Sequence, residues 1–330
     1  MNFLLLDTYD QTGFDFVLKR IKVPLVPVRP PKSPGGLIIQ WLLGIVKVLH
    51  ISRRHDTIVC VYDFQAVLSW WICYLFGWKR QFLALNLLLD LHPGLKNRWV
   101  ANMYRRALRS QNFSATVTSA EYGSWLNDSL GLSVSYTLLR DVYHPVYEVS
   151  PWPVRTDVFC GGRNGRDWDF LILIAKEMPD ISFTAVMPPK EYDRFAADVP
   201  GNVTLLTNIS FAEFAGRLSA SSVVCLPLYK QAPAGLIVLF QAAANRKPVM
   251  ISSTVTTREY LEGGRGCLLG RDLQEWVKAV RWSLSHQEES AKTASRLLRF
   301  CEEECSRDKY LDILQKLLTT VPRAPQTRKS

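Results

Sequence analysis

The sequence is poor in several features that mark whole classes of protein. Its seven cysteines in 330 residues form no Cys-x-x-Cys pair, so neither a zinc site nor a disulfide framework is indicated. The apolar run near the start of the sequence has no basic segment before it, and it is far shorter than the apolar region of a signal peptide. Gly and Pro number only 18 each, which excludes collagen-like and low-complexity chains. We therefore expect a reduced, folded and cytoplasmic protein.

Long apolar runs and acidic residues are both scarce in the first third of the chain. Two apolar segments, residues 37–51 and 64–78, are shorter than the roughly 20 residues that cross a bilayer. Each closes on a basic pair, at 53–54 and at 79–80. Residues 18–109 hold 15 Lys and Arg against three Asp, whereas the net charge of the whole chain is +10. Most of these side chains are typical of buried helices in an α/β layer. The basic residues beside the two segments are also typical of a protein that binds an anionic membrane surface, here the inner face of the membrane.

Nucleic acid is the other partner that such positive charge can indicate. No helix-turn-helix, zinc-finger, RNP or KH signature accompanies the charge. We therefore expect no nucleic-acid partner.

Apolar runs alternate with helical stretches twice along the chain, which predicts an α/β protein of two Rossmann-like, doubly wound parallel-sheet domains facing a cleft. In the first domain the longest predicted strand covers residues 82–91. The predicted organisation is a first domain at 1–142, a linker rich in Pro and aromatic residues at 143–156, a second domain at 157–320 and a disordered tail at 321–330.

The segment VFCGGRNGRDWD, residues 158–169, is the strongest motif. A strand enters a loop that holds Gly161, Gly162, Arg163, Gly165 and Arg166, and a helix opens directly afterwards. Glycines permit close approach of a backbone, a helix start offers free N–H groups, and arginines bind phosphate oxygens in a fork. The spacing is not the dinucleotide fingerprint Gly-x-Gly-x-x-Gly, and the segment also fits a tight strand-to-helix turn without a ligand.

A second turn of this kind lies in LPLYKQAPAGLIVLFQ, residues 226–241. A strand ends near Pro227, Lys230 lies in the loop, and Gly235 opens an apolar helix. The backbone N–H groups of Gly235, Leu236 and Ile237 would suit a pyrophosphate. Taken alone, the segment equally fits a plain loop before a buried helix.

Several pieces of the second domain together resemble a known family. They are GGRNGRDWDFLILIAKEMPDISF, the turn LPLYKQAPAG, then GLIVLFQAAANRKPVMISST and REYLEGGRGCLL, in that order. In order and spacing they look like the donor domain of glycosyltransferase family 4 and its GT-B relatives. The resemblance covers residues 157 to about 300, whereas the first domain shares only the alternation and the size.

The resemblance implies that residues 161–166 and 235–237 embrace the diphosphate of a nucleotide sugar. Arg166 is then the leading phosphate ligand, and Arg163 or Lys230 the second, so that no metal ion and no further cofactor is expected. The family usually has two Glu separated by seven residues across the second turn, and here Pro233 and Gln241 take their places. The amide of Gln241 can still bond ribose hydroxyls.

Candidates for the catalytic base of the first domain are polar side chains at predicted strand ends. His92 is the first choice and Asp90 the second, because both close the strand predicted at 82–91. Both also fit an ordinary loop.

The expected function is thus a retaining, metal-independent glycosyltransferase that moves a sugar from a nucleotide sugar donor to a glycan or lipid-linked acceptor. Cell-surface or exopolysaccharide biosynthesis is the expected context. A protein of this fold that only binds nucleotide sugar or glycan, or that acts as a scaffold, is the alternative.

Overall fold

The computed structural model describes residues 2–7, 16–17, 19–20, 24–28, 36–91 and 95–320. The chain divides into two compact units, the first made of Met1–Arg140 and Arg307–Ser330, the second of Asp141–Ser306. Residues 321–330, predicted to be a disordered tail, lie outside the described residues.

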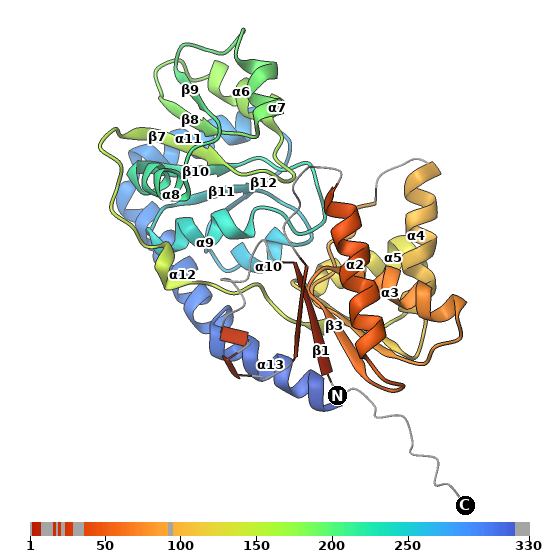
Figure 1. Cartoon of the computed structure of the whole chain (residues 1–330). Coiled ribbons are helices and arrows are strands. Elements are labelled where there is room, and N and C mark those ends of the chain that lie inside the picture. The colour runs from red at the N-terminus through yellow and green to blue at the C-terminus, as the bar shows by residue number, and fades with distance from the viewer. Residues whose placement is uncertain are drawn as a thin grey trace, which may run out of the picture. The chain divides into compact units, whose positions relative to one another are not determined.

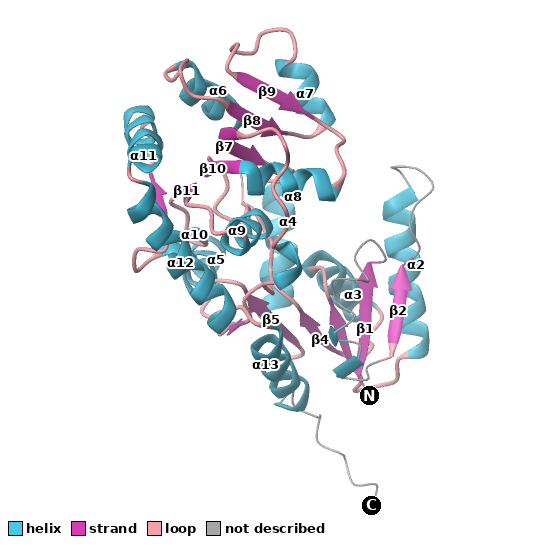
Figure 2. Ribbon diagram, turned by 90° about the vertical axis from the view of Figure 1, so that its left-hand side faces the viewer, coloured by secondary structure: helices cyan, strands magenta, loops and turns pink. Residues whose placement is uncertain are grey.

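The first unit is built on one parallel sheet. Its strands, among the described residues, are β1 (Asn2–Asp7), β2 (Leu25–Val28), β3 (Thr57–Cys60), β4 (Gln81–Ala84), β5 (Phe113–Val117) and β6 (Thr137–Leu138), in the order β2-β1-β3-β4-β5-β6. Figure 2 shows β2, β1, β4 and β5 as arrows of one layer. All four residues of β3 are buried, as expected for a central parallel strand covered on both faces.

Helices α2 (Gly36–Ile51), α3 (Asp63–Leu75), α4 (Leu95–Leu108) and α5 (Ala120–Leu130) connect these strands. From β2 onward each crossover leads toward β6, so the right-handed rule places all four helices on one face of the sheet. Neighbouring helices of this layer contact each other in chain order (Figure 1). The start and end of α5 follow from local sequence, because Ser119 Oγ accepts the Tyr122 N–H and Gly131 ends the helix at φ +59°.

The strand predicted at 82–91 is shorter than expected, since β4 ends at Ala84. Asn86 adopts a left-handed φ of +52°. Its N–H donates to Thr116 Oγ1 at 2.7 Å, and the Thr116 hydroxyl donates to Asn86 Oδ1 at 2.9 Å. These bonds attach the chain to Thr116 of β5 just after β4, and backbone bonds continue there from the Leu85 N–H to Cys60 O and from the Leu87 N–H to Thr116 O. Asp90 therefore lies in a loop, and the prediction that it closes a strand is wrong.

The second unit contains another parallel sheet. Its strands, again within the described part, are β7 (Thr156–Gly161), β8 (Phe183–Val186), β9 (Val203–Leu206), β10 (Ser221–Leu226), β11 (Val249–Ser252) and β12 (Cys267–Leu269), in the order β12-β11-β10-β7-β8-β9. Figure 2 shows β9, β8, β7 and β10 as successive arrows. Two parallel sheets, each interleaved with helices, confirm the predicted fold class.

The helices of the second unit follow the predicted alternation. They are α6 (Trp168–Lys176), α7 (Pro189–Phe195), α8 (Phe211–Ala220), α9 (Leu236–Ala244), α10 (Thr257–Leu261), α11 (Leu273–Ser285) and α12 (Gln287–Glu304). The core holds fully buried aromatic side chains, among them Phe159, Phe240, Tyr260 and Trp276. The Trp276 indole still finds a partner, because its Nε1–H donates to Gly270 O at 2.7 Å.

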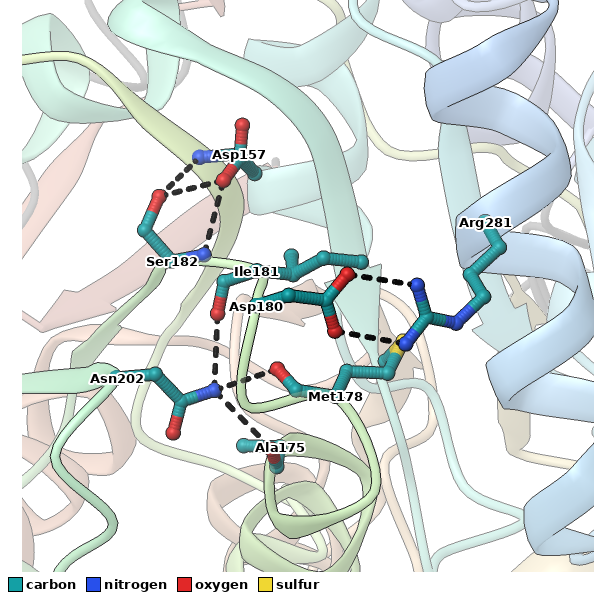
Figure 3. Close-up of polar contacts among 8 residues, drawn as sticks. All are labelled: Asp157, Ala175, Met178, Asp180, Ile181, Ser182, Asn202 and Arg281. Atoms are coloured by element: carbon teal, nitrogen blue, oxygen red, sulfur yellow. Dashed lines mark hydrogen bonds and ion pairs between the residues drawn. The ribbon is translucent and has the colours of Figure 1, made fainter.

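Polar contacts fasten the connection from α6 to β8 (Figure 3). Asn202 Nδ2 lies 3.1, 2.8 and 2.9 Å from the carbonyl oxygens of Ala175, Met178 and Ile181. Arg281 meets Asp180 through two N–H groups, each 2.8 Å from a carboxylate oxygen. These contacts add side-chain donors to carbonyls of the turn after α6 and attach the turn to α11.

Two segments group differently from the predicted domain boundaries. Residues 143–156, expected to be a linker, lie against the second unit, where Asn245 bonds Tyr147 O and the Val149 N–H at 2.8 and 3.2 Å. Helix α13 (Arg307–Thr320), expected in the second domain, belongs to the first unit, and the Tyr310 ring lies 5.9 Å from that of Phe16. An aromatic contact between distant parts of the chain leaves no periodic signal in a sequence.

None of the helices in the described residues is long and apolar enough to cross a membrane.

Candidate functional site

The glycine-rich loop of the second unit begins where β7 ends. Gly162 and Gly165 have φ values of +126° and +70°, which a residue with a Cβ adopts only with strain. The loop is tied by backbone bonds to the segment after β10: Tyr229 N–H donates to Gly165 O at 3.1 Å, and Asp167 N–H donates to Pro227 O at 2.9 Å. The two turns singled out in the sequence are therefore adjacent.

Arg166 lies at the centre of this arrangement and is only 5% exposed. Its Nε–H donates to Gly161 O at 2.8 Å and an Nη1–H donates to Asn164 O at 3.1 Å. Among the described residues no carboxylate forms an ion pair with it. Burial lowers the pKa of the guanidinium, although such a group stays charged at neutral pH. In the described part of the chain this buried positive charge therefore has no carboxylate counter-ion.

The start of α9 faces the same guanidinium. A Cβ placed on Gly235 would lie 3.4 Å from Arg166 Nη1 and 3.8 Å from Nη2, and one on Gly162 would lie 2.6 Å from Nη2. Gly235 has φ +84°, and no side chain caps the helix. The open N–H groups of a helix start carry partial positive charge. Arg166 and α9 therefore direct positive charge toward one point, which suits an anion such as a diphosphate.

A cavity of about 570 Å³, within the size range of small-molecule sites, is lined by the loop and includes Gly165 and Arg166 in its wall. Its lining includes the cations Arg163, Arg166, Lys190, Arg194 and Arg271 and the acids Asp167, Asp169 and Glu191. Arg194 pairs with both Asp169 and Glu191, at 3.0 and 3.1 Å, and Arg271 pairs with Asp167 at 3.1 Å. Cations outnumber acids along this wall, which favours an anionic ligand.

The remaining predicted donor-site residues are placed differently. Lys230 lies along the glycine loop, because a Cβ on Gly165 would meet its Cδ at 3.3 Å. Leu236 is buried, whereas the side chain of Ile237 is exposed, so only their N–H groups suit the predicted role. Gln241 is 1% exposed, and its Oε1 has no partner among the described residues. Gln241 does not line the cavity.

Of the two candidate bases in the first unit, Asp90 lies within the described residues. Asp90 is half-buried in the loop after β4, and two bonds hold the residues just before it: Leu88 N–H donates to Asp63 Oδ2 at 2.8 Å, and Tyr122 OH donates to Leu89 O at 2.7 Å. Burial raises the pKa of the Asp63 carboxyl, while its backbone hydrogen bonds act in the opposite direction. His92 lies outside the described residues.

Sequence reasoning missed Lys190, Arg194 and Arg271, which line the cavity. They follow the strands β8 and β12, whose carboxyl ends lie at the same edge of the sheet as the glycine loop. A search for cations after every strand of the second domain would have found them, because parallel strands bring their carboxyl ends together.

No family model matches the chain, and no curated protein matches it either. Solved structures do match. WaaG, a glycosyltransferase involved in lipopolysaccharide biosynthesis, has a TM-score of 0.67 at 12% identity, over 97% of this chain and 99% of that one. HepE of Anabaena, solved in complex with UDP-glucose, has a TM-score of 0.68 at 15% identity, over 96% and 91%. TarM of S. aureus, solved with fondaparinux, α-GlcNAc-glycerol and UDP, has a TM-score of 0.63 at 12% identity, over 85% and 59%.

The likeness at these identities concerns the fold, and membership of family 4 stays a prediction. Two parallel Rossmann-like sheets in series, matched over nearly the whole chain by known glycosyltransferases, show that this protein has the GT-B fold.

Proposed function

We propose that the protein is a glycosyltransferase that moves a sugar from a nucleoside diphosphate sugar to a glycan or lipid-linked acceptor, in the biosynthesis of cell-surface polysaccharide. The observation that carries this proposal is the buried Arg166 guanidinium beside the start of α9, without a paired carboxylate among the described residues. Matching structures of the same fold include one with UDP-glucose and one with UDP and glycan ligands, which supports a nucleotide sugar donor and a glycan acceptor.

The chemistry follows from where the charge develops. Transfer breaks the bond between the anomeric carbon and the oxygen of the β-phosphate, and negative charge grows on the departing diphosphate. Preorganised donors at that point stabilise the transition state more than the ground state. Arg166 has N–H groups beyond the two that its backbone partners use, and the first N–H groups of α9 face the same point.

We further propose that the reaction needs no metal ion, because the protein's own cations supply the charge at the leaving group. Turnover that persists in excess EDTA would support this, and loss of turnover with recovery on adding Mg²⁺ would refute it.

We also propose that the anomeric configuration is retained, which NMR of the product can check. Asp90 and His92 stay the proposed bases of the first unit, and Asp90→Asn should lower kcat without changing donor affinity.

A direct test measures release of nucleoside diphosphate from UDP-, GDP- and ADP-sugars in the presence of saccharide and polyprenyl phosphate acceptors. We expect one donor class to give turnover and Arg166→Gln to reduce kcat/KM by two orders of magnitude or more. A wild-type rate in the variant would refute the assigned role of Arg166.

A second candidate is a protein that binds nucleotide sugar without transferring it. The replacement of both family glutamates by Pro233 and Gln241 favours this candidate, as does the burial of Gln241 away from the cavity. Calorimetric binding of a nucleotide sugar with no product in the transfer assay would select it.

A further inference from the structure

A groove lies between α3 and α4 on the outer helix layer of the first unit. These two helices contact each other and enclose a cavity of about 670 Å³. Its apolar lining comes from Leu68, Trp71, Ile72 and Leu75 on α3 and from Trp99 and Met103 on α4. The Trp71 Nε1–H donates to Met103 O at 3.3 Å, which holds that indole across the two helices. The groove is therefore an ordered, mostly apolar cavity.

The rim of the groove exposes large apolar side chains to water. Leu75 is 72% exposed and Trp99 is 65% exposed. Phe76 and Trp78, directly after α3, are exposed as well and stack on each other at 5.4 Å. Scattered apolar side chains are common on surfaces, but exposed ones that line a cavity, as Leu75 and Trp99 do, are typical of a binding surface.

Arginines stand at the same groove. Arg106 places its guanidinium 5.7 Å from the ring centres of both Trp71 and Tyr74, and Arg105 and Arg109 line the cavity beside it. Arg105 and Arg109 also donate to the carbonyl oxygens of Leu130 and Gly131, at 2.6 and 3.0 Å. Backbone carbonyls orient these two guanidinium groups without neutralising them.

Acidic side chains are scarce in the chain segment that carries these arginines, and the nearest acid of the neighbouring helix α5 in sequence to their carbonyl partners is the exposed Asp128. Residues 64–120 contain seven Lys and Arg and only one acid, Asp90. The acid that opens α3, Asp63, is buried and accepts the N–H groups of Phe64 and Leu88. Within the described residues the three guanidinium groups of the groove therefore have no carboxylate partner.

From this juxtaposition we propose that the α3–α4 groove binds an anionic phospholipid and docks the first unit on an anionic bilayer. The phosphate meets Arg105, Arg106 and Arg109, and the first acyl carbons enter the cavity between Trp71, Leu75 and Trp99. Aromatic and aliphatic side chains next to arginine are the composition that interfacial binding uses. A nucleic acid fits less well, since the aliphatic lining offers no hydrogen bonds to base edges. The proposal rests on the first unit alone and not on the proposed glycosyl transfer.

Vesicle flotation of the full chain tests the proposal. Vesicles of phosphatidylcholine with 30 mol% phosphatidylglycerol, roughly the anionic content that attracts basic segments, should carry the protein, and pure phosphatidylcholine should not. The double variant Trp99→Ala/Arg106→Gln should bind at least about tenfold more weakly, because each Lys or Arg near such a surface contributes about fivefold and the indole adds to this. Trp282→Ala/Arg299→Gln is a matched control, since it removes an exposed Trp and an exposed Arg from the second unit.

The outcomes separate the sources of the anion. Three results together support the proposal. The wild-type chain and the control variant float with the anionic vesicles, the first double variant does not, and a moderate concentration of inorganic phosphate leaves the flotation intact. Absence of flotation, equal loss in both double variants, or displacement by free phosphate or by a DNA duplex overturns it. Trp99→Phe provides a check that is independent of folding defects: brominated acyl chains should quench the wild-type fluorescence more strongly than that of this variant. Equal quenching would place the lipid contact elsewhere and overturn the assignment.

Discussion

Replacing Arg166 by Gln is the sharpest perturbation of the proposed donor site. The guanidinium has five N–H groups, of which two serve Gly161 O and Asn164 O. The remaining groups can give a bound diphosphate one or two charge-assisted hydrogen bonds, each worth about 1.5–3 kcal/mol. We therefore expect a loss of about 2–4 kcal/mol in binding, which is roughly 30- to 1000-fold in Kd.

The free protein should respond differently from the complex. The shorter amide side chain would forfeit two hydrogen bonds of about 1 kcal/mol each, but the variant would also lose a buried charge that has no ion-pair partner among the described residues. These effects oppose each other, so we expect the free energy of unfolding without ligand to change by about 1 kcal/mol or less. The substitution thus separates ligand affinity from stability.

Thermal and urea unfolding with UDP, GDP and ADP measures both quantities. A ligand at 100 times its Kd adds about 2.7 kcal/mol to the wild-type free energy of unfolding, and a 100-fold weaker variant gains only about 0.4 kcal/mol at the same concentration. Arg299→Gln, an exposed arginine on α12, is the control for loss of one positive charge. Equal stabilisation of wild type and Arg166→Gln by every nucleotide that binds would refute the reasoning.

Other predictions concern single groups with defined partners. Gly235→Ala should weaken nucleoside diphosphate binding about tenfold or more in calorimetry, because φ +84° disfavours a Cβ and the methyl group would touch Arg166; unchanged affinity would remove α9 from the site. Asn202→Ala should cost about 1–2 kcal/mol in urea unfolding, since Ile181 O loses the amide donor while Ala175 O and Met178 O keep a backbone N–H, and a cost near zero would mean that water replaces the amide. The Arg281 guanidinium holds the pKa of Asp180 at about 2, below its usual 3.8, so the ion pair stabilises the fold fully above pH 4 and is lost as the pH falls toward 2. The stability difference between wild type and Asp180→Asn should therefore shrink over that range, and a constant difference would contradict the assignment. Ser69→Ala should raise the free energy of unfolding by about 1 kcal/mol, because the fully buried Ser69 hydroxyl has no partner among the described residues.

Much of the fold could be predicted from the alternation of apolar runs and helices. The strands at 222–227 and 247–252 appear as β10 and β11 within two residues, because buried parallel strands are almost wholly apolar. The run at 82–91 looked like one long strand for the same reason. The strand ends at Ala84, before the left-handed backbone of Asn86, and the bonds of Asn86 to Thr116, thirty residues away, leave no local pattern.

The candidate site could be predicted where it depends on glycine and on loop position. The sequence indicated Arg166 and Gly235 as parts of two separate turns, and the structure brings them within contact distance. Their adjacency follows from β7 and β10 being neighbours in the sheet, a strand order that the sequence does not specify. The roles of Arg194 and Arg271 depend on ion pairs with Asp169 and Asp167, which only the folded loop positions.

The backbone bonds between residues 165–167 and 227–229 bear on how donor preference can change during evolution. Hydrogen bonds between peptide groups join the two turns. If the proposed donor site holds, mutations at the exposed Tyr229 and in the loop that follows it should alter the sugar preference while the proposed diphosphate site keeps its backbone geometry. A scaffold of this kind lets new specificities arise by single substitutions without first weakening the fold.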